Sequence, residues 1–200
     1  MLAASDFQKL SSDSAHDFER LVAPMIIDWV GGEIVSIESL AGERSACIFD
    51  RHAGVDAVQI KTSEGMRGIA SRIQKGFRDD YRSFTVRYQT DRGGFDTEYQ
   101  KRLRAIKSKG ELFFPHWQSQ AYVTEFRTGG LIYLCFTKTI SIYGFDREHQ
   151  DKIKTRTHKK SGARFRVYDV SKLREAGYHV HTYENQAAIF SLNQQKGLFG

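Results

Sequence analysis

Residues 14–30 carry the clearest structural signal in this 200-residue sequence. Their apolar side chains recur at intervals of three and four positions, which is the spacing of one face of an α-helix. Ser14 is a suitable N-cap, Gly31-Gly32 follows as a stop, and Pro24 is expected to disturb the middle because proline lacks a backbone N–H. A helix with one apolar face must bury that face, so the rest of the chain has to supply a sheet or further helices to cover it.

The segments after this helix alternate between strand and helix patterns. Residues 33–39, 45–50 and 55–61 predict three strands, the last two joined by a turn at Ala53-Gly54. Apolar residues at four-residue steps predict a helix over 66–82, and a strand is predicted over 83–90. A charged segment predicts a helix over 97–110, capped by Asp96 or Thr97. A hairpin is predicted over 119–136 with Gly129-Gly130 at its turn, and further strands are predicted over 138–145 and 163–170.

This order predicts one α/β domain over residues 1–200, with a central mixed β-sheet flanked by helices. The core is expected over roughly residues 14–145, and 146–200 are expected to hold a basic loop and additional C-terminal strands. The N-terminus lacks the apolar core of a signal peptide and no long apolar run follows, so we expect a soluble cytoplasmic protein without a membrane partner. Cys47 and Cys135 both lie in apolar runs, which favours buried thiols.

Charge is distributed unevenly along the chain. The first fifty residues contain three basic and nine acidic residues, whereas the remaining 150 contain 27 basic and 15 acidic residues. A strongly basic segment favours a polyanionic partner, of which nucleic acid is the commonest. The sequence has no phosphate-binding P-loop, no dinucleotide-binding GxGxxG and no GxSxG, which argues against those enzyme classes.

Polar side chains gather at the predicted hairpin of residues 45–61. A turn around Gly54 places Asp50 opposite Gln59, and strand alternation puts Lys61 on the same face as Gln59. Carboxylate and amide oxygens are hard ligands suited to Mg²⁺, and a lysine beside them can orient a water or stabilise phosphoryl charge. Glu19, beside the apolar stripe of the first helix, is expected to lean over the same sheet edge.

This layout resembles the PD-(D/E)xK nuclease superfamily, which has the restriction-endonuclease-like fold of many restriction enzymes and Holliday-junction resolvases. The family has a helix with a glutamate, a β-meander with an aspartate on its second strand and (D/E)xK on its third, and then another helix. The matching residues, within roughly residues 14–90, are Glu19, Asp50 and Gln59-Ile60-Lys61. Glutamine departs from the family's acid and resembles the QxK variant. Asp56 is an alternative acid, although its place after Gly54 favours a turn residue.

The resemblance implies a Mg²⁺-dependent (or Mn²⁺-dependent) nuclease that hydrolyses DNA phosphodiester bonds, of phage or mobile-element origin. Glu19, Asp50 and Gln59 would then be the metal ligands, and Lys61 would orient water or stabilise charge. Two alternatives stay open: a non-catalytic nucleic-acid-binding module on the same fold, and a phage structural or interaction protein that has no such site.

Two surfaces are expected to contact nucleic acid. In the helix predicted over 66–82 one polar face collects Arg67, Ser71, Gln74 and Arg78. Residues 151–166 carry seven Lys and Arg residues against one acid and predict a loop that contacts phosphates. The phosphate contacts expected in that loop are Lys159, Lys160, Arg164 and Arg166.

Overall fold

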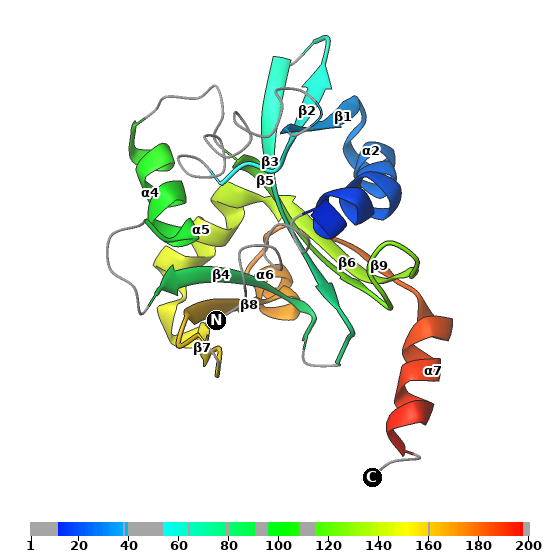
Figure 1. Ribbon diagram of the computed structural model, residues 1–200. Coiled ribbons are helices and arrows are strands. Elements are labelled where there is room, and N and C mark those ends of the chain that lie inside the picture. Colours follow the sequence, from blue (N-terminus) through cyan, green and yellow to red (C-terminus); the bar gives the residue numbers. More distant parts are fainter. Residues whose placement is uncertain are drawn as a thin grey trace.

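The structure, a computed structural model, describes residues 12–37, 39, 54–63, 65–78, 81–90, 96–108, 115–159 and 161–197. It is a mixed α/β fold with a six-stranded sheet, a three-stranded sheet and several helices (Figure 1). Among the helices of these segments, none is both long enough and apolar enough to cross a lipid bilayer. In chain order the elements are η1 (Phe18–Val22), α2 (Ala23–Val30), β1 (Glu33–Ser36), β2 (Ala57–Lys61), β3 (Gly65–Lys75), β4 (Ser83–Gln89), α4 (Glu98–Ser108), β5 (Pro115–Val123), β6 (Leu131–Lys138), α5 (Thr139–Glu148), η3 (Gln150–Lys152), β7 (Lys154–Thr157), β8 (Arg164–Asp169), α6 (Val170–Glu175), β9 (His181–Glu184) and α7 (Gln186–Gly197).

The six-stranded sheet has the strand order β1-β2-β3-β5-β6-β9. β1, β2 and β3 form an antiparallel meander, β5 pairs parallel with β3, and β6 and β9 continue the sheet in antiparallel pairs. Neighbouring parallel strands need a crossover connection between them, because the chain must return to the end where the first strand began. Here that crossover contains β4 and α4, and β4 joins a separate sheet of order β4-β8-β7.

Apolar side chains pack on both faces of the large sheet. Figure 1 shows η1 and α2 on one side of the sheet and α4 and α5 on the other. Adjacent residues of β5 divide between the two sides, because Ala121 packs with the residues of η1 and α2, whereas Tyr122 packs with those of α5 and β4. The strands at the centre of the sheet are therefore covered on both faces.

The predicted N-terminal helix is confirmed, and Phe18, Val22 and Ile26 are its fully buried contacts with the sheet. The disturbance expected at Pro24 takes the form of a π-helical turn, η1, which leads directly into α2 without a gap. A hydrogen bond also holds this helix to the β5–β6 turn, because the buried Asp17 carboxylate accepts the backbone N–H of Arg127 at 3.0 Å.

The third predicted helix and the predicted hairpin are also confirmed. Thr97 rather than Asp96 caps α4: its hydroxyl accepts the Gln100 N–H at 3.3 Å, and the Gln100 side chain accepts the Thr97 N–H at 2.8 Å. This reciprocal pair is a capping box. β5 and β6 form the expected antiparallel hairpin, and β4 and β8 occupy the predicted strands over 83–90 and 163–170.

Two predictions of element type were wrong. The helix predicted over 66–82 is strand β3, and the strand predicted over 138–145 is helix α5. In β3, Ile69 and Ile73 are buried on one face, and a spacing of four residues places side chains on the same face of a strand as well as of a helix. The apolar pattern was therefore real, but it did not distinguish the two structures.

The predicted pairing of Asp50 with Gln59 was also wrong. Gln59 lies between Ile34 on β1 and Arg67 on β3, so both edges of β2 are occupied at this position. The strand predicted over 45–50, including Asp50, lies outside the described residues. β2 is therefore the second strand of the described meander, and Gln59-Ile60-Lys61 lies on this second strand rather than on the third.

Candidate functional site

Gln59 is a structural residue in the described fold. Its side chain is buried, and its carbonyl oxygen accepts the indole N–H of Trp117 at 2.9 Å. Its amide nitrogen donates to the carbonyl oxygen of Gly31 at 2.7 Å. A buried amide whose oxygen and nitrogen both have partners fixes the end of α2 against the sheet, and it does not fit the role of an exchangeable metal ligand.

The other predicted catalytic residues have separate surroundings. The Glu19 carboxylate, on η1, accepts the Ser39 hydroxyl at 3.1 Å. The stem of Lys61 lies against the two glycines after α2, and a Cβ on Gly32 would come within 2.7 Å of Lys61 Cγ. Among the described residues, no three His, Cys, Asp or Glu side chains lie together in a group that could hold a metal ion. Because the third predicted ligand, Asp50, lies outside the described residues, the Mg²⁺ site stays a prediction.

The residues predicted to contact nucleic acid from a helix face lie instead on or beside strand β3. Arg67 and Ser71 point to one face of the sheet and Gln74 to the other, whereas Arg78 follows the end of the strand. The Arg67 guanidinium lies 6.0 Å from the centre of the Trp117 ring. The shared polar face expected for these residues was wrong, because it assumed helical spacing.

The basic segment after residue 150 forms the hairpin β7–β8 rather than a loop. Arg164 and Lys159 are exposed, and Lys160 lies outside the described residues. Arg166 is different because its guanidinium pairs with the buried Asp146 and lies 4.5 Å from the centre of the Tyr99 ring. This pairing fits a structural role for Arg166 better than the predicted phosphate contact.

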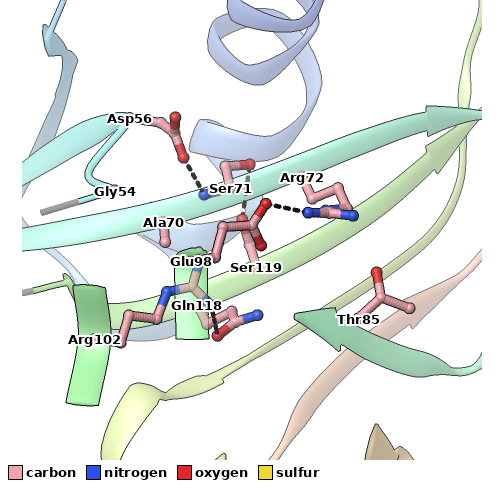
Figure 2. Close-up of a pocket in the computed structure, with 10 residues that line it drawn as sticks. All are labelled: Gly54, Asp56, Ala70, Ser71, Arg72, Thr85, Glu98, Arg102, Gln118 and Ser119. Carbon is pink, nitrogen blue, oxygen red and sulfur yellow. Dashed lines mark hydrogen bonds and ion pairs between the residues drawn. The ribbon is translucent and has the colours of Figure 1, made fainter. Parts of the chain in front are cut away.

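A pocket of about 80 Å³ lies where the meander, β4, β5 and α4 meet (Figure 2). This volume is enough for several water molecules. Its polar side chains come from parts of the sequence that lie far apart. The lining residues are Gly54, Asp56, Ala70, Ser71, Arg72, Thr85, Glu98, Arg102, Gln118 and Ser119.

Asp56 stands directly before β2 at the rim of the pocket. Its backbone N–H donates to the carbonyl oxygen of Ile69 at 2.9 Å, and its own carbonyl oxygen accepts the Ile37 N–H at 3.0 Å. The residue therefore extends the meander. Its carboxylate accepts the Ser71 N–H at 2.7 Å. The interpretation of Asp56 as a turn residue between two hairpin strands was therefore wrong. Its position is the beginning of the second meander strand, opposite the middle of the third.

Glu98 is the electrostatic centre of the pocket. It is the first residue of α4, and its carboxylate pairs with Arg72 from β3 and lies 3.4 Å from a nitrogen of Arg87 from β4. Burial alone would raise the pKa of this carboxyl, but Arg72, Arg102 and Arg87 outweigh that effect and hold the pKa below its usual value. Glu98 is therefore charged at neutral pH and faces an excess of positive charge.

Arg102 brings a buried cation to the same place. The residue is only 5% exposed, and its Nη1 donates to the Gln118 side-chain oxygen at 2.7 Å. In the described part of the chain, neither the Nε atom of Arg102 nor that of Arg87 has a hydrogen-bond partner. Buried donors without partners are costly, and an oxyanion entering the pocket would bring the acceptors that such donors lack.

A second network holds α4 in position. Tyr99, next to Glu98, donates its hydroxyl to the buried Asp146 of α5 at 2.6 Å, and Tyr168 of β8 donates to the same carboxylate at 3.0 Å. Burial, together with the hydrogen bond to Asp146, raises the pKa of Tyr99 to about 12. The tyrosine therefore stays protonated, keeps this contact at neutral pH and ties the first turn of α4 to the core.

Sequence reasoning missed Arg72, Arg87, Glu98 and Arg102. Arg87 lies inside the confirmed strand 83–90, but an arginine between apolar neighbours is also the usual alternation of a half-exposed strand, so the pattern did not single it out. Arg72 was hidden by the wrong helix prediction. Comparison of the chain with protein-family models, with curated proteins and with solved structures found no match.

The first testable consequence concerns Gln59. Gln59→Glu should lower the free energy of unfolding by about 1–3 kcal/mol near neutral pH, because a buried carboxylate would face the Gly31 carbonyl without a donor. Burial raises the pKa of the introduced acid, so the loss should be smaller at about pH 5 and larger at about pH 8. Urea unfolding of this variant and of the exposed control Gln89→Glu measures the difference. Equal stability of the two variants at both pH values would contradict the structural role of Gln59.

The second consequence concerns the pH dependence that Glu98 confers. Its pKa is lowered in the folded state, so its contribution to stability is present above the unfolded value and is lost as pH falls through the folded value. Between about pH 5 and pH 3, wild type should therefore lose more unfolding free energy than Glu98→Gln does. Glu175→Gln, which removes an exposed carboxylate of α6, is the matched control and should follow wild type. Parallel curves for wild type and Glu98→Gln would show that the arginines do not hold this carboxylate charged.

Proposed function

We propose that this protein binds nucleic acid and that its pocket holds a backbone phosphate. The observation that carries the proposal is the set of three guanidinium groups, from Arg72, Arg87 and Arg102, around the single carboxylate of Glu98. Arginine presents several donors in a plane and matches the geometry of phosphate oxygens. Arg72 and Arg102 line the pocket, and the unpartnered Nε atom of Arg102 supplies a donor that a phosphate would satisfy.

The exposed basic residues of the β7–β8 hairpin support the same proposal. Lys154, Lys159 and Arg164 are exposed there, and Arg156 is half-buried with its guanidinium 5.6 Å from the centre of the Tyr81 ring. Such residues supply sequence-independent attraction to a phosphate backbone, which positions the nucleic acid but does not select a base sequence. DNA is the favoured partner, as the sequence predicted.

A second candidate function, hydrolysis of the bound phosphodiester, is favoured by the position of Asp56. A PD-(D/E)xK nuclease carries its aspartate on the second strand of the meander, and Asp56 lies at the beginning of β2. The order of helix, meander and parallel β5 also supports a restriction-endonuclease-like core. The third strand departs from the family, because Ser71-Arg72-Ile73, beside the Asp56 carboxylate that accepts the Ser71 N–H, contains neither the acid nor the lysine.

The pocket fits a phosphate better than it fits the divalent cation that the resemblance implies. Two carboxylates, Asp56 and Glu98, line it, but the second is paired with arginines whose positive charge would repel Mg²⁺. We therefore assign no catalytic step to a metal ion. Asp56 is the residue that we propose as the general base, since its carboxylate lies at the rim where a water can approach a bound phosphate.

Binding is tested with variants that remove one positive charge each. Arg72→Gln should weaken binding and reduce the slope of log K against log salt by about 0.9 on duplex DNA, because a side chain that lines the pocket loses its phosphate contact. Lys172→Gln removes an exposed charge of α6 and should leave the slope unchanged. Fluorescence anisotropy with double-stranded DNA, single-stranded DNA and RNA gives the slopes, and thermal melting identifies any variant that fails to fold. Slopes equal to that of Lys172→Gln would reject the pocket as a phosphate site.

Cleavage is tested separately with Asp56→Asn, which keeps an oxygen to accept the Ser71 N–H. Loss of a general base should lower the cleavage rate about 10²–10⁴-fold while binding stays unchanged. The assay uses the same three nucleic acids with Mg²⁺, with Mn²⁺ and with a chelator. Wild type that binds but cleaves none of them would leave the non-catalytic binding module as the function. Wild type that binds none of them would reject both candidates in favour of a structural or interaction protein.

A further inference from the structure

Two histidines meet at the edge of the six-stranded sheet, away from the pocket. His179 lies two residues before His181, the first residue of β9, and β9 is the last strand in the sheet order. Side chains two residues apart on an extended chain point to the same side. Their Nε2 atoms are 3.1 Å apart, and the planes of the two rings are almost perpendicular, at 88°.

The surroundings of this histidine pair hold the His181 ring and the backbone of both residues in place. The His181 ring stacks on Trp29 of α2, with centroids 5.2 Å apart and an interplanar angle of 16°. The backbone on either side is also fixed, since the Thr137 hydroxyl donates to the His179 carbonyl at 2.6 Å and Arg174 donates to the Val180 carbonyl at 2.8 Å. The His181 ring and the backbone at His179 and Val180 are therefore held by contacts other than the one between the two nitrogens.

The surroundings of His181 favour the neutral form of its ring. Burial, the neighbouring His179 and Arg174 lower the pKa of His181. Arg174 also donates to the Thr182 hydroxyl at 2.8 Å, and the side chain of Thr182 points to the opposite side of β9 from that of His181. The Arg174 guanidinium therefore contributes to the lowered pKa of His181 from the opposite side of β9. A neutral imidazole nitrogen is the form of histidine that binds metal ions.

We propose that His179 and His181 form a two-histidine site for a divalent transition metal such as Zn²⁺ or Ni²⁺. Zn–N bonds are about 2.0–2.1 Å, so two nitrogens at a tetrahedral angle around one ion lie roughly 3.3 Å apart. The observed 3.1 Å requires only a small movement of the exposed His179 ring. Since no third His, Cys, Asp or Glu completes the group within the described segments, water fills the remaining positions and the site can take an external ligand.

The test uses tag-free protein titrated with Ni²⁺ and with Zn²⁺ at about pH 7.5. Calorimetry gives the affinity, and quenching of tryptophan fluorescence by Ni²⁺ reports on Trp29, which stacks on His181. His179→Gln and His181→Phe should each weaken binding about tenfold or more, the second variant keeping an aromatic ring against Trp29. His158→Gln, a histidine exposed in the β7–β8 turn, is the matched control and should bind as wild type does.

Two further conditions make the result specific. Mg²⁺ should neither bind nor compete, because imidazole prefers the later transition metals. Binding should weaken at about pH 5.5, where protons compete for both imidazoles. If both histidine variants bind Zn²⁺ and Ni²⁺ as tightly as the His158→Gln control, the site does not exist. The readout needs no nucleic acid, so its outcome is independent of the proposed function.

Discussion

β3 and β5 run parallel at the centre of the large sheet, and the chain must cross over between them. The crossover contains β4 and α4, and this arrangement brings Arg87 and Glu98 to the same place as Arg72 of β3. An antiparallel turn between the two central strands would have left no room for either element. The crossover segment that the parallel pairing requires therefore supplies part of the wall of the pocket.

The two faces of the sheet use polar side chains in different ways. On the face covered by α2, Gln59 has a partner for its oxygen and for its nitrogen, as a buried structural amide should. On the other face, one carboxylate faces three guanidinium groups, and two buried Nε atoms remain without a hydrogen bond in the described residues. In the proposed function, the oxygens of a bound phosphate would supply an acceptor to the Arg102 Nε atom.

The parts of the fold that the sequence predicted correctly depend on neighbours in the chain. The apolar stripe before Gly31-Gly32, the Thr97 cap and the Gly129-Gly130 turn act over a few residues, and each is where it was expected. The errors arose where local pattern is ambiguous or where contacts are distant. β3 satisfied a helical and an extended spacing equally well, and α5 contains β-branched residues that favour strands in isolation.

The candidate site was the least predictable part for the same reason. Gln59 and Lys61 attracted attention because they are close in sequence, but Gln59 turns to Trp117, which is 58 residues away. Asp56, Arg72 and the α4 pair Glu98 and Arg102 belong to three separate segments and meet only through the sheet order. The resemblance to a nuclease singled out Gln59-Ile60-Lys61 on β2, whereas the charged residues of the pocket come from other segments.

The connectivity of the sheet has a consequence for how the protein assembles. The β1–β2–β3 meander and the β5–β6 hairpin are built from contacts between neighbouring strands, so each can form early and independently. Pairing of β3 with β5 closes a much longer loop. The entropic cost of closing this loop must be met before the pairing can stabilise the folded state. The two halves of the sheet therefore come together late in folding, and the arginine–carboxylate cluster forms only in a chain whose halves have docked in register.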